Sequence, residues 1–323
     1  MAGQSGDCWP ASRRPSGISY GTDAEQVFLL RHPERVRTMT LISGSPLDIR
    51  LFNFQPGNAQ LALDYVFARC QADPGCHQAF PHLAADWAAL WASLGKAPWV
   101  LPAAQSPTGT TQRFDQDMLA SWMYNAMFTG NIGLIPVVVH TLATATNKAA
   151  TVAALFKALQ ATGQLSPGTS SGVNQMMVYE IECTEPWQTV QPAALADQRG
   201  SFFYQTDLQS AQLMQFICPL IPKSAAAVGQ QQLTASTVPV LAFNGAYDPV
   251  EQPRNWAGAQ QLFPDSRDIA LPGQGHDTNY TWDVCAGPLT QAFIEQASVA
   301  QLDTSCLATV PTPPFELTIP APA

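Results

Sequence analysis

The pattern of apolar and polar residues near the start of the chain predicts a helix followed by a strand. Residues 22–32 have helical spacing, and Pro33 ends the predicted helix. Residues 37–45 (RTMTLISGS) form a short β-rich run ended by Gly44, as expected of a buried parallel strand. The inward face of the helix is predicted to hold Ala24, Val27, Phe28 and Leu30, or a set shifted from these.

The middle of the chain has a different pattern. It is rich in Ala, Gln and Leu with helical spacing, as in NAQLALDYVFARC. We interpret residues 47–235 as a mostly helical cap insertion. One apolar stripe could form a substrate-binding wall, but helix packing is the favoured interpretation. The stripe consists of Trp87, Leu90, Trp91 and Leu94.

Alternation of strands and helices returns at residue 236. VPVLAFNG and RDIALPGQGH read as strands, the second running into a Gly-rich loop, whereas QPRNWAGAQQLF and CAGPLTQAFIEQ read as helices. The sequence therefore predicts an α/β fold with a parallel sheet and flanking helices. Its core consists of residues 17–46 and 236–307. We expect residues 1–16 to be irregular and the Pro-rich tail, residues 308–323, to be extended.

Composition and charge exclude several classes of protein. Of the 323 residues, 46% are hydrophobic and only 12% charged, which is a globular composition. The net charge of -9, with 15 Lys and Arg residues, argues against nucleic acids and anionic membranes as partners. No apolar run reaches the roughly 18 residues that a membrane span needs. Nothing in the sequence predicts the oligomeric state.

The seven cysteines favour disulfides over scattered buried thiols. There is no C-x-x-C pair and only five His, so we expect no zinc site. A bridge from Cys70 to Cys76 could close the polar loop CQADPGC. Disulfides imply an oxidising compartment, yet the N-terminus has no signal-peptide pattern. Cys8 is left over, and we expect that the true N-terminal part of the protein is missing.

Candidate chemistry begins with a G-x-S-x-G motif, residues 17–21. The pattern acquires meaning when a helix follows the turn, because the turn then lifts the hydroxyl of Ser19 off a sheet. A surface Gly/Ser turn is the alternative. A serine hydroxyl is a poor nucleophile at neutral pH and needs a base that is itself oriented by an acid.

The sequence supplies an acid and a base in the chain order expected for this fold. Asp248 follows the strand VLAFNG, and His276 follows the strand DIAL. Both come after the C-terminal end of a strand, where open α/β sheets place their sites. Asp277 is a rival acid, but a residue next to His276 would struggle to reach the far ring nitrogen.

Four segments together resemble the tripeptidyl-aminopeptidase and proline-iminopeptidase branch of the α/β-hydrolases. They are GISYGT…RHPERV, NGAYDPV, PGQGHDT and LDTSC. The resemblance implies a serine exopeptidase that releases short peptides or residues from the N-terminus of a peptide. It implies that Ser19 is the nucleophile, that Asp248 orients His276, and that His276 is general base and then general acid. The Tyr20 backbone N–H would be one oxyanion donor.

The same resemblance has further implications. Members are mostly exported bacterial enzymes, so the parent protein is expected to be secreted or periplasmic. Glutamates in the cap of such enzymes can bind the α-amine of the substrate, and Glu185 best matches that position among Glu180, Glu182 and Glu185. A solvated acidic turn is the alternative. The mechanism needs no cofactor. The implied disulfides are Cys70–Cys76, Cys183–Cys218 and Cys285–Cys306.

The sequence also departs from this family. No H-G-G motif, which would supply a second oxyanion donor, occurs in it. Residues 8–16 contain two Pro and two Arg, which suit no buried strand. We therefore expect a partial α/β-hydrolase fold whose first strands are missing. An esterase or lipase, acting on a small acyl substrate, stays open as an alternative, and so does a non-catalytic fragment or a subunit that needs a separate N-terminal half.

Overall fold

The computed structural model describes six stretches of the chain. The prediction for residues 1–15 and the position of Cys8 lie outside them. At Ser16, where irregular structure was expected, the chain already forms a strand. The described residues are 16–106, 108–161, 174–185, 193–222, 234–278 and 281–320.

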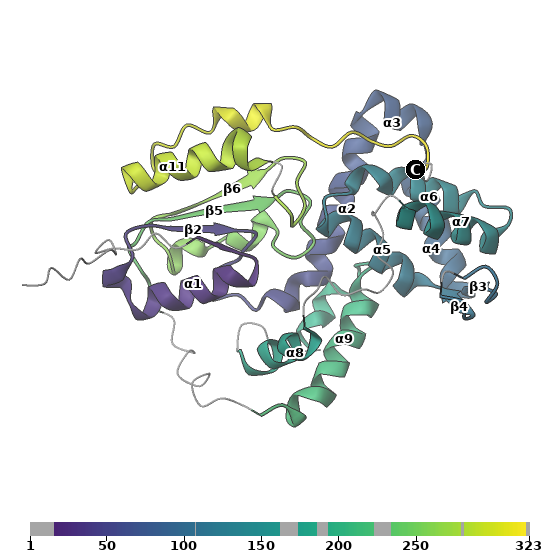
Figure 1. Ribbon diagram of the computed structural model, residues 1–323, viewed down its shortest axis with the longest axis horizontal. Helices are drawn as coiled ribbons and strands as arrows, with labels where there is room; N and C mark the ends of the chain where they lie inside the picture. Colours follow the sequence, from purple (N-terminus) through teal and green to yellow (C-terminus); the bar gives the residue numbers. More distant parts are fainter. Residues whose placement is uncertain are drawn as a thin grey trace, which may run out of the picture.

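A four-stranded parallel sheet confirms the predicted α/β class (Figure 1). Its order is β1-β2-β5-β6, and the pairings join Gly17 to Leu41, Leu41 to Ala242 and Ala242 to Asp268. Every residue of β2 and β5 is buried, as in parallel sheets that are covered on both faces. The strands are β1 (Ser16–Ile18), β2 (Met39–Ile42), β5 (Val240–Gly245) and β6 (Ser266–Leu271).

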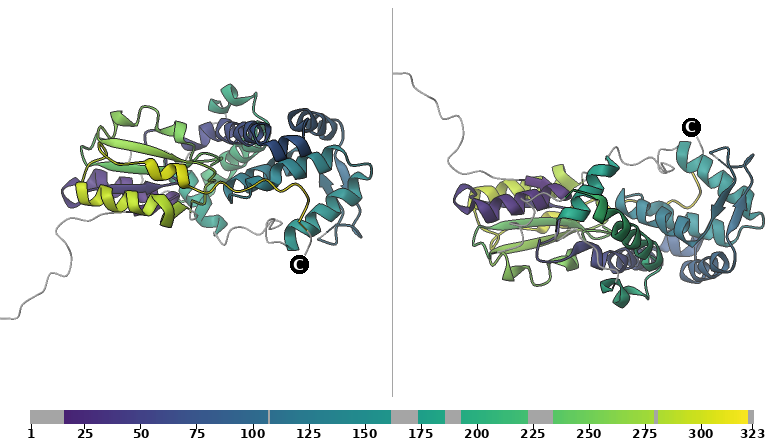
Figure 2. Two further views of the ribbon diagram at one scale, coloured as in Figure 1. Left: turned by 90° about the horizontal axis from the view of Figure 1, so that it is seen from above. Right: turned by 90° about the horizontal axis from the view of Figure 1, so that it is seen from below.

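Helices α1 (Tyr20–Arg31) and α11 (Gly287–Gln296) cover the two faces of the sheet (Figures 1 and 2). Alternate residues of β5 point to the two sides. Leu241 and Phe243 belong to the apolar core beneath α11, whereas Val240 and Ala242 belong to the core beneath α1. This alternation follows from the two-residue period of a strand.

The buried face of α1 is the shifted alternative to the set that was named first. It is formed by a shifted, largely polar set, and Ala24 is exposed. The face is polar because it lies against the chain that follows β2, whose backbone needs hydrogen-bond partners. Gln26 Nε2 donates to the Ser45 carbonyl (2.9 Å), and its Oε1 accepts from the Leu47 N–H (3.1 Å). The buried set is Thr22, Asp23, Gln26 and Leu29.

The chain between β2 and β5 forms a mainly helical body, which we call the insertion. In Figure 1 it lies beyond one end of the sheet. Trp87, Leu90 and Leu94 are in its apolar core, so packing explains most of the predicted stripe. A two-stranded antiparallel sheet, β3 (Trp99–Leu101) and β4 (Gln112–Phe114), completes it. Its helices are α2 (Leu51–Ala72), α3 (Pro74–Ala79), α4 (Leu83–Lys96), α5 (Gln116–Phe128), α6 (Ile135–Ala143), α7 (Lys148–Ala161), α8 (Gln175–Thr184) and α9 (Tyr204–Ile217).

Short helical turns replace the helix that was predicted after β5. The chain forms η5 (Pro253–Trp256) and η6 (Ala259–Gln261), separated by Gly258 with a φ of 88°. A residue in this left-handed conformation interrupts a right-handed helix. Other short turns are η1 (Pro33–Arg35), η2 (Ile132–Leu134), η3 (Ala194–Gln198), η4 (Cys218–Leu220), η8 (Trp282–Ala286) and η9 (Ser305–Thr309).

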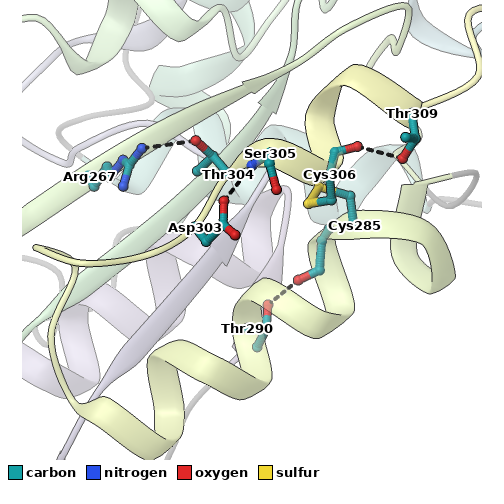
Figure 3. Close-up of a disulfide and its surroundings, with 9 residues drawn as sticks. Arg267, Cys285, Thr290, Asp303, Thr304, Ser305, Cys306 and Thr309 are labelled. Atoms are coloured by element: carbon teal, nitrogen blue, oxygen red, sulfur yellow. Dashed lines mark hydrogen bonds between the residues drawn. A yellow bond between two sulfur atoms is a disulfide. The ribbon is translucent and has the colours of Figure 1, made fainter.

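The three disulfides that the resemblance implied are all present. Figure 3 shows the last one, which ties η8 to η9, and Thr304 beside it accepts a hydrogen bond from Arg267 of β6 (3.4 Å). Three disulfides are typical of proteins in oxidising compartments. The pairs are Cys70–Cys76, Cys183–Cys218 and Cys285–Cys306.

The segment after η9 crosses from the sheet to the insertion (Figure 1). Arg69 of α2 donates a hydrogen bond to the Pro313 carbonyl, and its guanidinium lies 4.2 Å from the centre of the Phe315 ring. The Glu316 N–H donates to the Gly133 carbonyl (3.0 Å). Residues 311–316 form no helix or strand, so they connect the two bodies through side chains and single backbone contacts.

In the described part of the chain, no helix combines the length and apolarity that a membrane crossing requires.

Phe243 provides a test of the sheet core. It is fully buried, so Phe243→Ala is expected to lower the free energy of unfolding by about 3–5 kcal/mol. Phe216 is 74% exposed, and Phe216→Ala should change it by less than about 0.5 kcal/mol. Urea denaturation without reductant measures both. Equal losses in the two variants would contradict this account of the core.

Candidate active site

Ser19 lies in a strained turn between β1 and α1. Its φ of 53° and ψ of -128° are unusual for a residue with a side chain. The Ser19 N–H donates to the Ile42 carbonyl (2.9 Å), which ties the turn to β2. A Cβ at Gly17 would lie 2.5 Å from the Gly21 carbonyl oxygen, so this position requires glycine. Gly21 has open space around it, so only the first glycine of the motif is sterically required.

The structure brings Ser19, His276 and Asp248 into one hydrogen-bonded line. His276 Nε2 lies 2.9 Å from Ser19 Oγ, and Nδ1 lies 2.8 Å from Asp248 Oδ2. Asp248 is fully buried, and its other oxygen accepts the N–H groups of Val250 (2.8 Å) and Glu251 (2.9 Å). The carboxylate is therefore fixed in the orientation that pairs it with the imidazole.

The loop that carries His276 is held from two sides. Ser43 Oγ, just after β2, donates to the His276 carbonyl (2.7 Å). On the other side, the Phe128 carbonyl at the end of α5 accepts the N–H groups of His276 (3.0 Å) and Asp277 (3.2 Å). The Phe128 ring is stacked on the imidazole, with centroids 4.3 Å apart. The sequence did not point to Phe128. It lies at the end of a helix, and a helix end carries no signal of which distant loop it will contact.

Tyr20 and Glu185 meet beside the serine. Tyr20 is the first residue of α1, and its hydroxyl donates to Glu185 Oε1 (2.6 Å). Burial, followed by this hydrogen bond, raises the pKa of Tyr20 well above its ordinary value. Glu185 directly follows α8, and burial raises the pKa of Glu182 on that helix to about 7. Of the three candidate glutamates, Glu185 is the one that contacts the residue next to Ser19.

Two further acids with buried carboxyl oxygens, Glu251 and Asp207, were not singled out from the sequence. Glu251 is hydrogen-bonded to Ser45, and burial raises its pKa well above the ordinary value. Asp207 on α9 accepts a hydrogen bond at Oδ1 from Gln55 Nε2 (3.4 Å). Its Oδ2 is buried without a hydrogen-bond partner in the described structure. Burial raises the pKa of Asp207 to about 7. Asp207 lies in the first turn of α9, where acidic residues are common. Its position in the sequence therefore gave no reason to expect a functional role.

Tyr124 of α5 lies close enough to Asp207, Asp248 and Glu251 for their charges to affect it. Burial raises the pKa of Tyr124 well above its ordinary value, and the charges of Asp207, Asp248 and Glu251 add to the effect. Loss of the Tyr124 proton is therefore opposed both by burial and by any negative charge on these carboxyl groups. Among the residues that the structure describes, no group of three or more His, Cys, Asp or Glu side chains is placed to hold a metal ion.

Comparison with models of protein families relates part of the chain to a known family. The model of the family of TAP-like proteins matches residues 204–306, about a third of the chain. This stretch includes Asp248 and His276 but not Ser19. No curated protein matches the chain. The match relates the chain to the α/β-hydrolases, in agreement with the parallel sheet, and suggests a serine hydrolase.

Asp207 provides a test of the buried acids. Its pKa in the folded chain is about 7, above the unfolded value, so the stability that it contributes is full below pH about 4 and is lost as the pH rises through 7. Asp207→Asn removes this dependence. Between pH 4 and pH 8, the free energy of unfolding of Asp207→Asn should gain about 1–3 kcal/mol relative to the unmodified protein.

Urea denaturation at a series of pH values measures the effect, and Asp64→Asn, at an exposed position of α2, is the control. Parallel stability curves for the unmodified protein and Asp207→Asn would contradict the raised pKa.

Proposed function

We propose that the chain is a serine hydrolase that forms an acyl-enzyme at Ser19. The observation that carries the proposal is the pair of hydrogen bonds on His276, 2.9 Å to Ser19 Oγ and 2.8 Å to Asp248 Oδ2. This arrangement supplies the nucleophile, the base and the orienting acid that acyl transfer requires.

Each group has a defined role in the proposed reaction. Ser19 Oγ attacks the substrate carbonyl while its proton passes to His276 Nε2. The resulting imidazolium is stabilised by Asp248 and gives the proton to the leaving group as the acyl bond breaks. A water molecule then repeats these steps on the acyl-enzyme, and Ser19 is regenerated. The reaction consumes one water molecule for each bond that is cleaved.

The negative charge on the carbonyl oxygen needs a donor close to Ser19. The Tyr20 backbone N–H is at the first position of α1, where helix N–H groups lack intrahelical partners and the helix dipole favours an anion. We assign this N–H as one oxyanion donor. Removing a single such donor in other serine hydrolases costs about 10² to 10³ in rate.

For the substrate, we propose a peptide with a free N-terminus, from which the enzyme releases a residue or a short peptide. Glu185 would bind the α-amine. The proposal is supported by the hydrogen bond that Glu185 accepts from the Tyr20 hydroxyl, which holds a carboxylate against the side chain of the residue that follows the nucleophile. The match to TAP-like proteins and the three disulfides are compatible with a secreted or periplasmic peptidase.

The nucleophile is tested by labelling the purified, oxidised chain with a fluorophosphonate. We expect the unmodified chain to be labelled and Ser19→Ala to lose the label, because the reagent needs an activated serine. Ser121→Ala, at an exposed position of α5, is the control and should label normally. A folded chain that takes up no label, or a label retained in Ser19→Ala, would refute the proposal.

The substrate is tested with Glu185→Gln and a pair of peptide anilides, one with a free and one with an acetylated N-terminus. The variant should raise KM for the free peptide by about tenfold and leave the acetylated one unchanged, because a charge-assisted hydrogen bond to the amine is lost. Glutamine still accepts the Tyr20 hydrogen bond. Glu180→Gln on the exposed side of α8 is the control. Unchanged discrimination in Glu185→Gln would remove Glu185 from this role.

The same preparation distinguishes the esterase or lipase alternative. Cleavage of nitrophenyl esters without cleavage of unblocked peptide anilides would move the assignment from peptidase to esterase and leave the chemistry of Ser19 unchanged.

A further inference from the structure

We propose that Phe128, at the end of α5 in the insertion, is a positioning residue for His276. Its carbonyl holds the backbone of the His276 loop, and its ring sets the tilt of the imidazole toward Ser19. The inference rests on the proposed function of His276 as the base.

The backbone contact follows from the way α5 ends. The last carbonyl groups of a helix have no partner within the helix. The Phe128 carbonyl accepts hydrogen bonds from the N–H groups of His276 (3.0 Å) and Asp277 (3.2 Å). Both belong to the loop that carries His276, which we call the base loop. The loop approaches so closely that a Cβ at Gly275 would lie 1.9 Å from the Met127 carbonyl oxygen. The end of α5 and the base loop are therefore in fixed register.

The ring contact supplies a restraint that the hydrogen bonds of the imidazole lack. The bonds to Asp248 and Ser19 are made by ring nitrogens, whose N–H and lone pair point outward in the plane of the imidazole. They resist rotation within that plane more strongly than tilt out of it. The Phe128 ring covers the face of the imidazole, with centroids 4.3 Å apart and planes inclined by 19°, and therefore opposes the tilt.

The same face favours the charged state that appears during the reaction. An aromatic face attracts a cation placed over it, and the attraction is larger where water is excluded. His276 is 8% exposed, so the imidazolium formed as Ser19 loses its proton would lie over the Phe128 ring in a largely dry setting. The stacked Phe128 ring is therefore expected to stabilise the state in which the Ser19 proton has moved to His276. It is not expected to change the affinity for substrate.

Phe128 is itself held by its neighbour one helical turn earlier. Tyr124 stacks on it with ring planes inclined by 16° and centroids 6.2 Å apart. Residues four apart lie on the same face of a helix, so α5 presents both rings on the side of His276. The base of the proposed mechanism is therefore positioned partly by the insertion, and not only by the sheet that carries its loop.

The test compares Phe128→Leu, which removes the ring and keeps the carbonyl, with Phe128→Tyr, which keeps both. Phe80→Leu is the matched control, because the Phe80 ring contacts His140 at a centroid distance of 5.4 Å, away from Ser19. Fluorophosphonate labelling is measured over a range of reagent concentrations, which separates the rate of the bond-forming step from reagent affinity. The low-field proton resonance of the His276–Asp248 hydrogen bond is recorded by NMR for each variant.

Phe128→Leu should slow the bond-forming step by about fivefold with little change in affinity, whereas Phe128→Tyr and Phe80→Leu should keep it within about twofold. The low-field resonance should broaden only in Phe128→Leu. An unchanged labelling rate in Phe128→Leu, or equal losses in Phe128→Leu and Phe80→Leu, would overturn the inference. If the unmodified chain takes up no label, the proposed function fails, and the resonance alone decides whether Phe128 positions His276.

Discussion

The geometry of the site depends on one property of the parallel sheet. The C-terminal ends of all its strands lie at the same end of the sheet. Ser19 follows β1, Asp248 follows β5 and His276 follows β6, so their loops meet although the residues are far apart in the sequence. The order β1-β2-β5-β6 leaves β2 between the serine strand and the acid strand. β2 also contributes to the site, because Ser43, directly after it, donates to the His276 carbonyl.

Several acids besides Asp248 are poorly solvated. Glu251, Asp207 and Glu182 all have raised pKa values, and burial is the largest cause for each. Such groups cost folding free energy when they are ionised, so a chain selected for stability alone would replace them. The raised pKa values mean that these acids take up protons at a higher pH than exposed carboxyl groups do.

Short local patterns predicted much of this structure. The G-x-S-x-G turn, the order of Ser19, Asp248 and His276, the strands after residue 236 and the three disulfide pairs were all accessible from the sequence, because each depends on a local signal or a family spacing. The sequence left the inner face of α1 open between two sets, because the polar residues that decide it bond backbone groups of the segment after β2. The turns that replace the helix at 252–263 depend on the left-handed Gly258. The contact of Phe128 with the base loop was out of reach, since it joins two segments that only the tertiary fold brings together.

The crossing of the C-terminal segment has a mechanical consequence. The insertion leaves the sheet after β2 and returns at β5, and these two strands are neighbours, so the two covalent connections start from adjacent strands. Gln274 in the base loop donates to the Pro311 carbonyl (3.3 Å), and Glu316 binds Gly133 of the insertion. The segment is thus a third tie that is anchored at both ends. A pull on the chain beyond Glu316 would load the helical body first, and this tie, together with the contact of Phe128 with the His276 loop, would pass the load to the sheet.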